Sequence, residues 1–198
     1  MKNIIVNLPL NMNTNLVVEK EKLENPPLEM HYLGDKVLRQ PTKRVAKVDD
    51  SIRELAKEML QTMYSENGIG LAAPQIGVNK QIIVIDCQPD NPNNPPLILI
   101  NPEIKRFSKD LCVMEEGCLS IPQVFLEVTR PRSIEVVYKD EYGKQKKIKA
   151  MGLLSRVIQH EMDHLNGVLF VDRVQNSFAL TEELNKKGFS VSAVQPIS

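Results

Sequence analysis

The sequence has little of three features that often reveal a protein's class. Lys plus Arg and Asp plus Glu both number 25, so no net charge attracts the chain to nucleic acid or to an anionic membrane. Its three cysteines, an odd number in a chain of this length, argue against a disulfide framework and for a reducing compartment. No apolar run approaches the roughly 20 residues that span a membrane. We therefore expect neither a nucleic-acid binder nor a membrane protein.

The 198 residues, 42% of them hydrophobic and 25% charged, are enough for one domain with a sizeable core. We expect this domain at residues 28–187. Residues 1–27, which end at Pro26-Pro27, are predicted to be an N-terminal extension, either an ordered edge strand or a loose arm, and residues 188–198 a C-terminal tail. The start lacks the pattern of a secretory signal or a transit peptide. The cytoplasm is the expected location, with a plastid stroma as the alternative if a transit peptide has been removed.

The pattern of elements predicts an α+β fold. A helix begins at Ser51, which forms a capping box with Glu54, and Gly68 is its expected C-cap. Apolar runs predict strands at 81–86 and 97–100, with a proline-rich loop between them. The remaining expected elements are a hairpin at 133–150 and helices at about 152–165 and 174–187. We expect mostly antiparallel β-sheets wrapped around the central helix 152–165.

The central helix carries the sequence His-Glu-x-x-His. His160 and His164 are about one helical turn apart, so their imidazoles point the same way and can chelate a divalent metal, with Glu161 beside a metal-bound water. Leu153 and Val157 share this face, which predicts a metal site next to a hydrophobic pocket. A second apolar stripe contains Leu154, Ile158 and Leu165, and the remaining, polar face contains Ser155, Arg156, Gln159 and Asp163.

A catalytic site of this kind usually needs a third protein ligand and an open position. The longer metzincin pattern fails because Phe170 stands where its third histidine would be. Glu182 and Glu183 are alternatives on a later helix, where solvated charges are the simpler interpretation. Among the cysteines, Cys118 in the short segment "EEGCLSIP" is only modestly favoured. The other two cysteines, Cys87 and Cys112, fit structural roles.

Three segments together resemble one family, the peptide deformylases. The family's motifs are present as "GIGLAAPQ" (68–75), "EGCLS" (116–120) and "QHEMDH" (159–164), and the similarity runs from about Met30 to Val174. The resemblance implies a small α+β metallohydrolase that removes the formyl group from N-formylmethionine of nascent chains. It implies Fe²⁺ as the metal, with Ni²⁺, Co²⁺ or Zn²⁺ able to substitute. It also implies transient proximity to the ribosome.

The resemblance assigns roles residue by residue. Cys118, His160 and His164 would hold the metal, and a metal-bound water would attack the formyl carbon. Glu161 would act as general base and then as general acid. The side chain of Gln75 and the backbone N–H of Leu119 would stabilise the oxyanion.

The substrate would lie in a pocket next to the metal. Gly68 and Gly70 would let the backbone pass close to an extended peptide. Four apolar side chains are expected to line the methionine pocket, with Glu116 near its wall: Ile69, Met114, Leu153 and Val157. The segment "GIGLAAPQ" (68–75) also fits G-x-G-x-x-A, the pattern of dinucleotide-binding loops. We reject this interpretation because the segment follows a helix instead of a strand, and Pro74 prevents a second helix from starting there.

Two arginine assignments and two other functions stay open at this point. Arg132 is an expected ion-pair partner behind Cys118, with Arg130 as competitor. Arg156, where many family members have an aliphatic residue, is expected to pair with Asp163 on the polar face, and the alternative is that it rims the pocket. The alternative functions are a metallopeptidase that cuts internal bonds and a non-enzymatic, metal-stabilised binding module. The second would need a fourth ligand, and His31 lies far from every motif.

Overall fold

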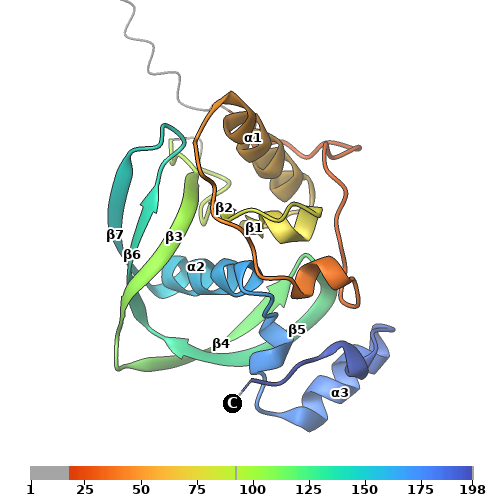
Figure 1. Cartoon of the computed structure of the whole chain (residues 1–198). Helices are drawn as coiled ribbons and strands as arrows, with labels where there is room; N and C mark the ends of the chain where they lie inside the picture. The colour runs from red at the N-terminus through yellow and green to blue at the C-terminus, as the bar shows by residue number, and fades with distance from the viewer. Residues whose placement is uncertain (1–17, 92, 198) are drawn as a thin grey trace, which may run out of the picture.

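The computed structural model describes residues 18–91 and 93–197 (Figure 1). Residues 1–17 of the expected extension lie outside the described residues. Residues 18–27 are not a strand; they run along the first helix. No helix in the described part of the chain is long and apolar enough to cross a membrane.

The first helix, α1 (Asp50–Ser65), has its N-cap two residues before the expected Ser51. Its N-cap is Asp49, whose carboxylate accepts the backbone N–H of Ile52, so the prediction of a Ser51 cap is wrong. At the other end, Asn67 takes the left-handed conformation (φ 57°) and the N–H of Gly68 bonds to the carbonyl of Met63 at 2.8 Å. The left-handed residue is therefore Asn67, one position before the glycine that was expected.

The larger sheet has five antiparallel strands in the order β1-β2-β3-β6-β7 (Figure 1). The expected hairpin at 133–150 is confirmed as β6 and β7. The strands are β1 (Gly70–Ala72), β2 (Ile82–Ile85), β3 (Leu97–Phe107), β6 (Ser133–Lys139) and β7 (Gln145–Met151). These pairings, with the central helix, confirm the predicted α+β fold with antiparallel sheets.

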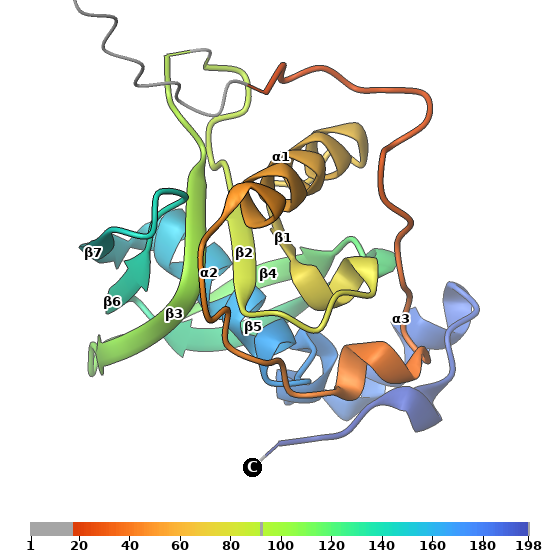
Figure 2. The same cartoon turned by 45° about the horizontal axis from the view of Figure 1, so that its top comes forward.

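At β1 and β2 both faces of this sheet are buried, because α1 covers one face and the central helix, α2 (Gly152–Leu165), covers the other (Figure 2). Neighbouring side chains of a strand point to opposite faces. Ile82 accordingly packs into the cluster around α1, and Ile83 packs into the cluster around α2. This double burial explains why β2 is a continuous apolar run with no polar alternation.

The smaller sheet is a hairpin of β4 (Leu111–Cys118) and β5 (Ile121–Pro131). Neither strand was predicted from the sequence. The segment 115–122 was expected to be irregular. Only Leu119 and Ser120 form the turn, because Cys118 pairs directly with Ile121. In β4 the hydrophobic alternation is weak, because the buried side chain of this strand is Glu116. In β5 the alternating apolar residues Val124, Leu126 and Val128 are present, and the prediction did not recognise them.

The central helix α2 has the expected bounds and lies between the large sheet and the hairpin (Figure 1). Its apolar side packs against the sheet through Val157, Ile158 and Leu165. The face expected to be solvated is also buried. It packs against the hairpin with four polar side chains, all at most 7% exposed: Ser155, Arg156, Gln159 and Asp163.

The C-terminal part completes a third cluster, on the face of β5 that carries Val124, Leu126 and Val128. The last helix, α3 (Ser177–Lys186), packs there, and Glu183 on it pairs with Lys186 at 3.3 Å. The expected tail also packs against this cluster, through Phe189, Val191 and Val194. Among the residues that the structure describes there are also four short 3₁₀ helices: Lys36–Arg39, Ala73–Ile76, Phe170–Arg173 and Val191–Ala193.

The double burial of β2 predicts that two neighbouring residues are equally important. Ile82→Ala and Ile83→Ala should each lower the free energy of unfolding by about 2–5 kcal/mol, because each leaves a cavity in a different core. Urea denaturation would measure both. The control Val113→Ala changes a side chain that is 57% exposed and should cost less than about 0.5 kcal/mol. A large loss for only one of the two isoleucines would contradict double burial.

Candidate active site

The three predicted metal ligands come together. One ligand atom from each of Cys118, His160 and His164 lies within 4.8 Å of the others, and the Sγ of Cys118 is 3.3 Å from Nε2 of His164. Cys118 ends strand β4, whereas both histidines project from α2. The other two cysteines are not part of this group.

His160 is oriented by a carboxylate on its far side. Its Nδ1 lies 2.9 Å from Oε2 of Glu116, so the ring donates its proton there and leaves Nε2 free for the site. The ring of Phe170 stacks against His160 with centroids 5.9 Å apart. Phe170, which excluded the metzincin pattern, therefore supports the first histidine by packing.

Glu116 is part of a buried ionic network between the hairpin and α2. Arg130 binds its carboxylate with two donors, at 2.6 and 2.9 Å, and reaches Asp163 of α2 at 2.7 Å. Burial alone would raise the pKa of Glu116, but the hydrogen bonds from Arg130 and His160 outweigh it and hold the pKa well below its ordinary value. The buried ion-pair partner in this region is therefore Arg130, the alternative considered above, and not Arg132.

Arg156 belongs to the same network and does not pair with Asp163, so that prediction is wrong. Its Nη1 donates to Glu116 and to the carbonyl of Val128, both at 2.8 Å, and its Nη2 donates to the carbonyl of Cys112 at 2.7 Å. Asp163 instead binds Arg130 and Arg173. The reason is that this face of α2 is covered by the hairpin, where the strand carbonyls and Glu116 are the available acceptors.

Glu161 is buried beside the ligands and carries an unsatisfied oxygen. Only 4% of the residue is exposed, and within the described residues its Oε2 has no hydrogen-bond partner. Burial raises the pKa of this carboxyl from 4.5 to about 7, against the opposing effect of His160. A Cβ on Gly70 would collide with this carboxylate and lie 2.8 Å from Val157, so glycine is needed there for space.

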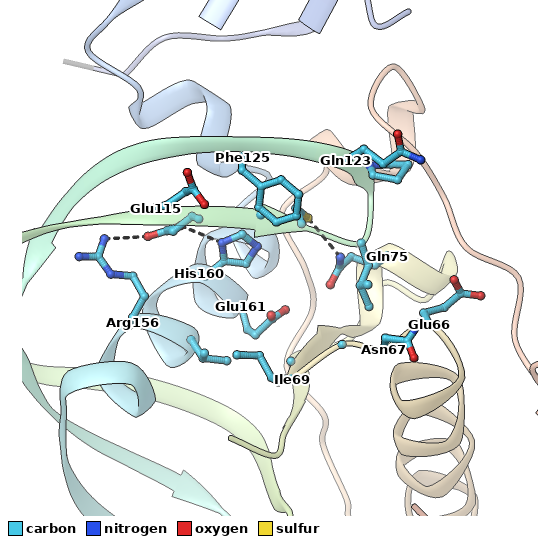
Figure 3. A pocket seen from close by; sticks show the side chains of 18 of the residues that line it. Glu66, Asn67, Ile69, Gln75, Glu115, Gln123, Phe125, Arg156, His160 and Glu161 are labelled. Carbon is cyan, nitrogen blue, oxygen red and sulfur yellow. Dashed lines mark hydrogen bonds and ion pairs between the residues drawn. The ribbon is translucent and has the colours of Figure 1, made fainter. Parts of the chain in front are cut away.

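Gln75 and Leu119 lie on the other side of the ligands. The Oε1 of Gln75 accepts the N–H of Ala72 at 2.8 Å, which fixes the amide so that Nε2 points to Ser120 at 3.1 Å and to the sulfur of Cys118 at 3.5 Å. Figure 3 shows Gln75 and Glu161 facing each other across the site. Leu119 is in the turn directly after Cys118.

A cavity of about 540 Å³ opens in front of these residues (Figure 3). Six of the seven predicted substrate-binding residues line it: Gly68, Ile69, Gly70, Glu116, Leu153 and Val157. Met114 is not among the lining residues and is 37% exposed. Arg156 lines that side instead, because it binds the backbone of Cys112 and Val128, on either side of Met114 in the hairpin.

Sequence reasoning missed several lining residues. Phe125 stands over Gly117, where a Cβ would lie 2.5 Å from its ring, and both line the cavity. Asn67 and Gln123 also line it and have positive φ angles of 57° and 62°. Only the hairpin register, which brings Gly117 beside Phe125, could have revealed the first pair. The positive φ angles of Asn67 and Gln123 could not be predicted, because no sequence pattern marks this conformation at a residue other than glycine.

The donor set fits a catalytic metal. One thiolate and two imidazoles leave the fourth position of a tetrahedral metal site open. In the described residues, no other histidine, cysteine or carboxylate joins the group as a fourth ligand. The unsatisfied oxygen of Glu161 lies in the same buried space. An open position beside a buried carboxyl is typical of hydrolytic metal sites and unlike a closed structural one.

Fold and site together define a metal-dependent hydrolase of the α+β class. The family model for polypeptide deformylase matches residues 27–178, and the chain belongs to this family. Members remove the N-formyl group from nascent polypeptides and depend on a metal. The predicted family, fold class and hydrolase activity are confirmed.

Similar proteins agree along almost the whole chain. A peptide deformylase of Synechocystis sp. is 67% identical over 94% of this chain and all of its own length. The crystal structure of a Synechococcus elongatus peptide deformylase in complex with actinonin is 61% identical, has a TM-score of 0.90, and covers 91% of this chain and 98% of that one. The Thermotoga maritima enzyme is 40% identical, with a TM-score of 0.71, and covers 75% of this chain.

The raised pKa of Glu161 predicts that the metal-free protein is stabilised by removing this carboxyl. The folded state binds the proton more tightly than the unfolded chain does, so stability is lost as the pH rises from 4.5 through about 7. Glu161→Gln should therefore be more stable than the parent above pH 7, by at most about 3 kcal/mol, and equal to it below pH 4.5.

Thermal or urea unfolding at pH 4.5 and pH 8 would measure this difference. The matched control is Glu182→Gln, which changes an exposed carboxyl on α3 and should alter neither value by more than about 0.5 kcal/mol. A Glu161→Gln variant that is less stable than the parent at pH 8 would contradict the buried, unpaired carboxyl.

Proposed function

We propose that Cys118, His160 and His164 bind Fe²⁺ and that the chain uses this centre to remove the formyl group from N-formylmethionine of nascent chains. One observation carries the proposal: a thiolate and two imidazoles converge within 4.8 Å beside a buried, unpaired Glu161 at the edge of a cavity. Ni²⁺, Co²⁺ and Zn²⁺ suit the same nitrogen and sulfur donors.

When bound, the divalent ion acts as a Lewis acid toward water and the formyl oxygen. Glu161 takes the proton of the attacking water and later delivers it to the leaving amine. A carboxyl with a pKa of about 7 can do both near neutral pH. Gly70 supports this role because its lack of a side chain leaves room for the carboxylate.

Gln75 and Leu119 are the proposed oxyanion donors. The amide of Gln75 is held by Ala72 and is 1% exposed, so its Nε2–H₂ is already oriented before substrate binds. Leu119 directly follows the proposed ligand Cys118 and lines the same cavity, so its backbone N–H is the second proposed donor. Loss of one such donor typically lowers kcat by about 10²–10³.

The methionine side chain is proposed to enter between α2 and the segment before β1. Leu153 and Val157 form one wall and Ile69 the other, which suits a flexible thioether chain. Gly68 and Gly70 allow the peptide backbone to run close beside this segment. A formyl carbon carries only hydrogen, so a cramped site of this kind would accept it and reject acetyl.

We also propose the cytoplasm as the location and transient proximity to the ribosome, since the substrate is a nascent chain. The equal numbers of acidic and basic residues, 25 each, give no overall charge that would hold the protein on ribosomal RNA. A brief encounter with an emerging N-terminus fits this balance.

Two substitutions separate metal binding from catalysis. Glu161→Gln should keep the metal, because it changes no ligand, and lower kcat on a formyl-Met peptide by about 10² or more. Cys118→Ser should lose metal in competition with a chelator, because a thiolate ligand is removed. Metal content and deformylation rate are measured for each variant, with Cys87→Ser, which lies outside the ligand group, as the control.

The same assay decides between the proposed reaction and its alternatives. Anaerobic, iron-loaded protein is offered formyl-Met, acetyl-Met and an internally cleavable peptide. Only the first should react. Cleavage of the internal bond without deformylation would favour a metallopeptidase, and full activity of Glu161→Gln would remove the proposed base.

Iron beside an accessible thiolate predicts sensitivity to oxidation. Cys118 is half-buried and lines the cavity, so peroxide can reach it. Iron-loaded protein should lose most of its activity after brief peroxide exposure, whereas nickel-loaded protein should keep more. Activity and the mass of the Cys118 peptide are followed together, and an iron-loaded enzyme that survives prolonged exposure would contradict the assignment.

A further inference from the structure

Residues 18–26 precede the part of the chain that the family model matches, yet they make specific contacts. The segment lies along α1 and starts beside the loop between β2 and β3 (Figure 2). Val18 packs against the core around α1, and the backbone N–H of Leu23 bonds to Ser65 at 3.2 Å. The segment is therefore attached to the domain by a defined set of interactions.

Lys20 makes the strongest of these contacts. Its ammonium donates to Oδ2 of Asp86 at 2.7 Å and to the carbonyls of Asn91 and Asn94 at 2.9 and 2.8 Å. An ammonium has three N–H donors, so all of them are used. The Lys20 side chain is 15% exposed and that of Asp86 is fully buried.

Asp86 is the centre of a buried polar cluster just after β2. Its carboxylate also accepts the hydroxyl of Tyr64 on α1 at 2.9 Å and the backbone N–H of Gln88 at 2.9 Å. Lys20 supplies the positive charge in this cluster. Removal of one partner of a buried ion pair leaves an uncompensated charge, which the surrounding structure must move to hydrate.

The backbone of Asp86 holds one wall of the cavity. Its N–H donates to the carbonyl of Ile69 at 2.9 Å, and the next pair in the ladder is Gly70 with Ile85. Ile69 and Gly70 both line the cavity, and Gly70 is in contact range of Glu161. A shift of Asp86 therefore changes the segment along which the substrate backbone would run.

We propose that Lys20 is a positioning residue for substrate binding: its ion pair with Asp86 fixes Ile69 and Gly70 at the cavity wall. The N-terminal segment thus contributes to the site without touching it. This inference rests on the proposed placement of the peptide beside Gly68–Gly70. It adds a residue outside the matched family region to the machinery of the reaction.

The test is Lys20→Met in the full chain, with two readouts. KM for a formyl-Met tripeptide should rise about tenfold and kcat should stay within about twofold, because the loss of a charged hydrogen bond displaces the wall and not the catalytic groups. The backbone N–H of Asp86 should exchange with solvent at least about tenfold faster, whereas amides of β6 and β7 stay protected.

Three further variants keep the result interpretable. Lys22→Met changes an exposed lysine on the same segment and should leave KM unchanged. Lys20→Arg retains the charge and should recover most of the affinity. Lys20→Met combined with Asp86→Asn removes both charges and should be closer to the parent than Lys20→Met alone.

An unchanged KM for Lys20→Met overturns the proposal, even if Asp86 exchanges faster. Equal losses of kcat and of folded protein, without recovery by Lys20→Arg, would reduce Lys20 to a general stabilising role and also overturn it. A failure of the proposed function itself looks different, because the unsubstituted protein would then not turn over formyl-Met peptides at all.

Discussion

The site depends on one buried ionic bridge between two elements that are far apart in the sequence. The proposed metal ligands come from β4 and α2, so the distance between hairpin and helix decides whether they can meet. Arg130 binds Glu116 and Asp163 at once, and Glu116 in turn holds His160. The same contacts therefore hold the hairpin against α2 and orient His160, a proposed ligand. Any movement between the two elements would change the distances among the proposed ligands.

Such a bridge is an expensive way to join two elements. Well-packed apolar residues of similar volume often stabilise a core as much as a buried ion pair, because charges must first lose their hydration. Here four charged side chains at most 7% exposed meet in one place: Glu116, Arg130, Arg156 and Asp163. What the charges provide is geometry, since bidentate contacts fix angles as well as distances. The carboxyl of Glu161, which is buried with one oxygen unpaired, lies close to them, and its proposed role as general base would explain this unfavourable burial.

The sequence predicts local features of this protein well and contacts between distant segments poorly. His160, Glu161 and His164 follow from helical periodicity alone. The apolar runs at 81–86 and 97–100 and the hairpin at 133–150 predict every strand of the large sheet except β1. Cys118 could be assigned only through the resemblance, because its partners lie more than 40 residues away in α2. The hairpin β4–β5 was missed, and with it the burial of Arg156. In β4 the buried residue is the charged Glu116, so the apolar alternation that normally marks a strand is absent there, whereas β5 has it at Val124, Leu126 and Val128. Without the hairpin register, the direction of Met114 could not be predicted.

Glu116 and Cys118 are two residues apart on β4, both reach a histidine of α2, and the chain reverses immediately afterwards at Leu119. This spacing has an evolutionary consequence. Insertion of one residue between them would turn one of the two side chains to the opposite face, so the orienting carboxylate and the sulfur ligand could no longer serve the same centre. A change of length in the hairpin is easier to accommodate at its far end, near Lys109 and Asp110, which are exposed. Related chains should therefore differ in length at that end of the hairpin and keep the same length around the turn at Leu119 and Ser120.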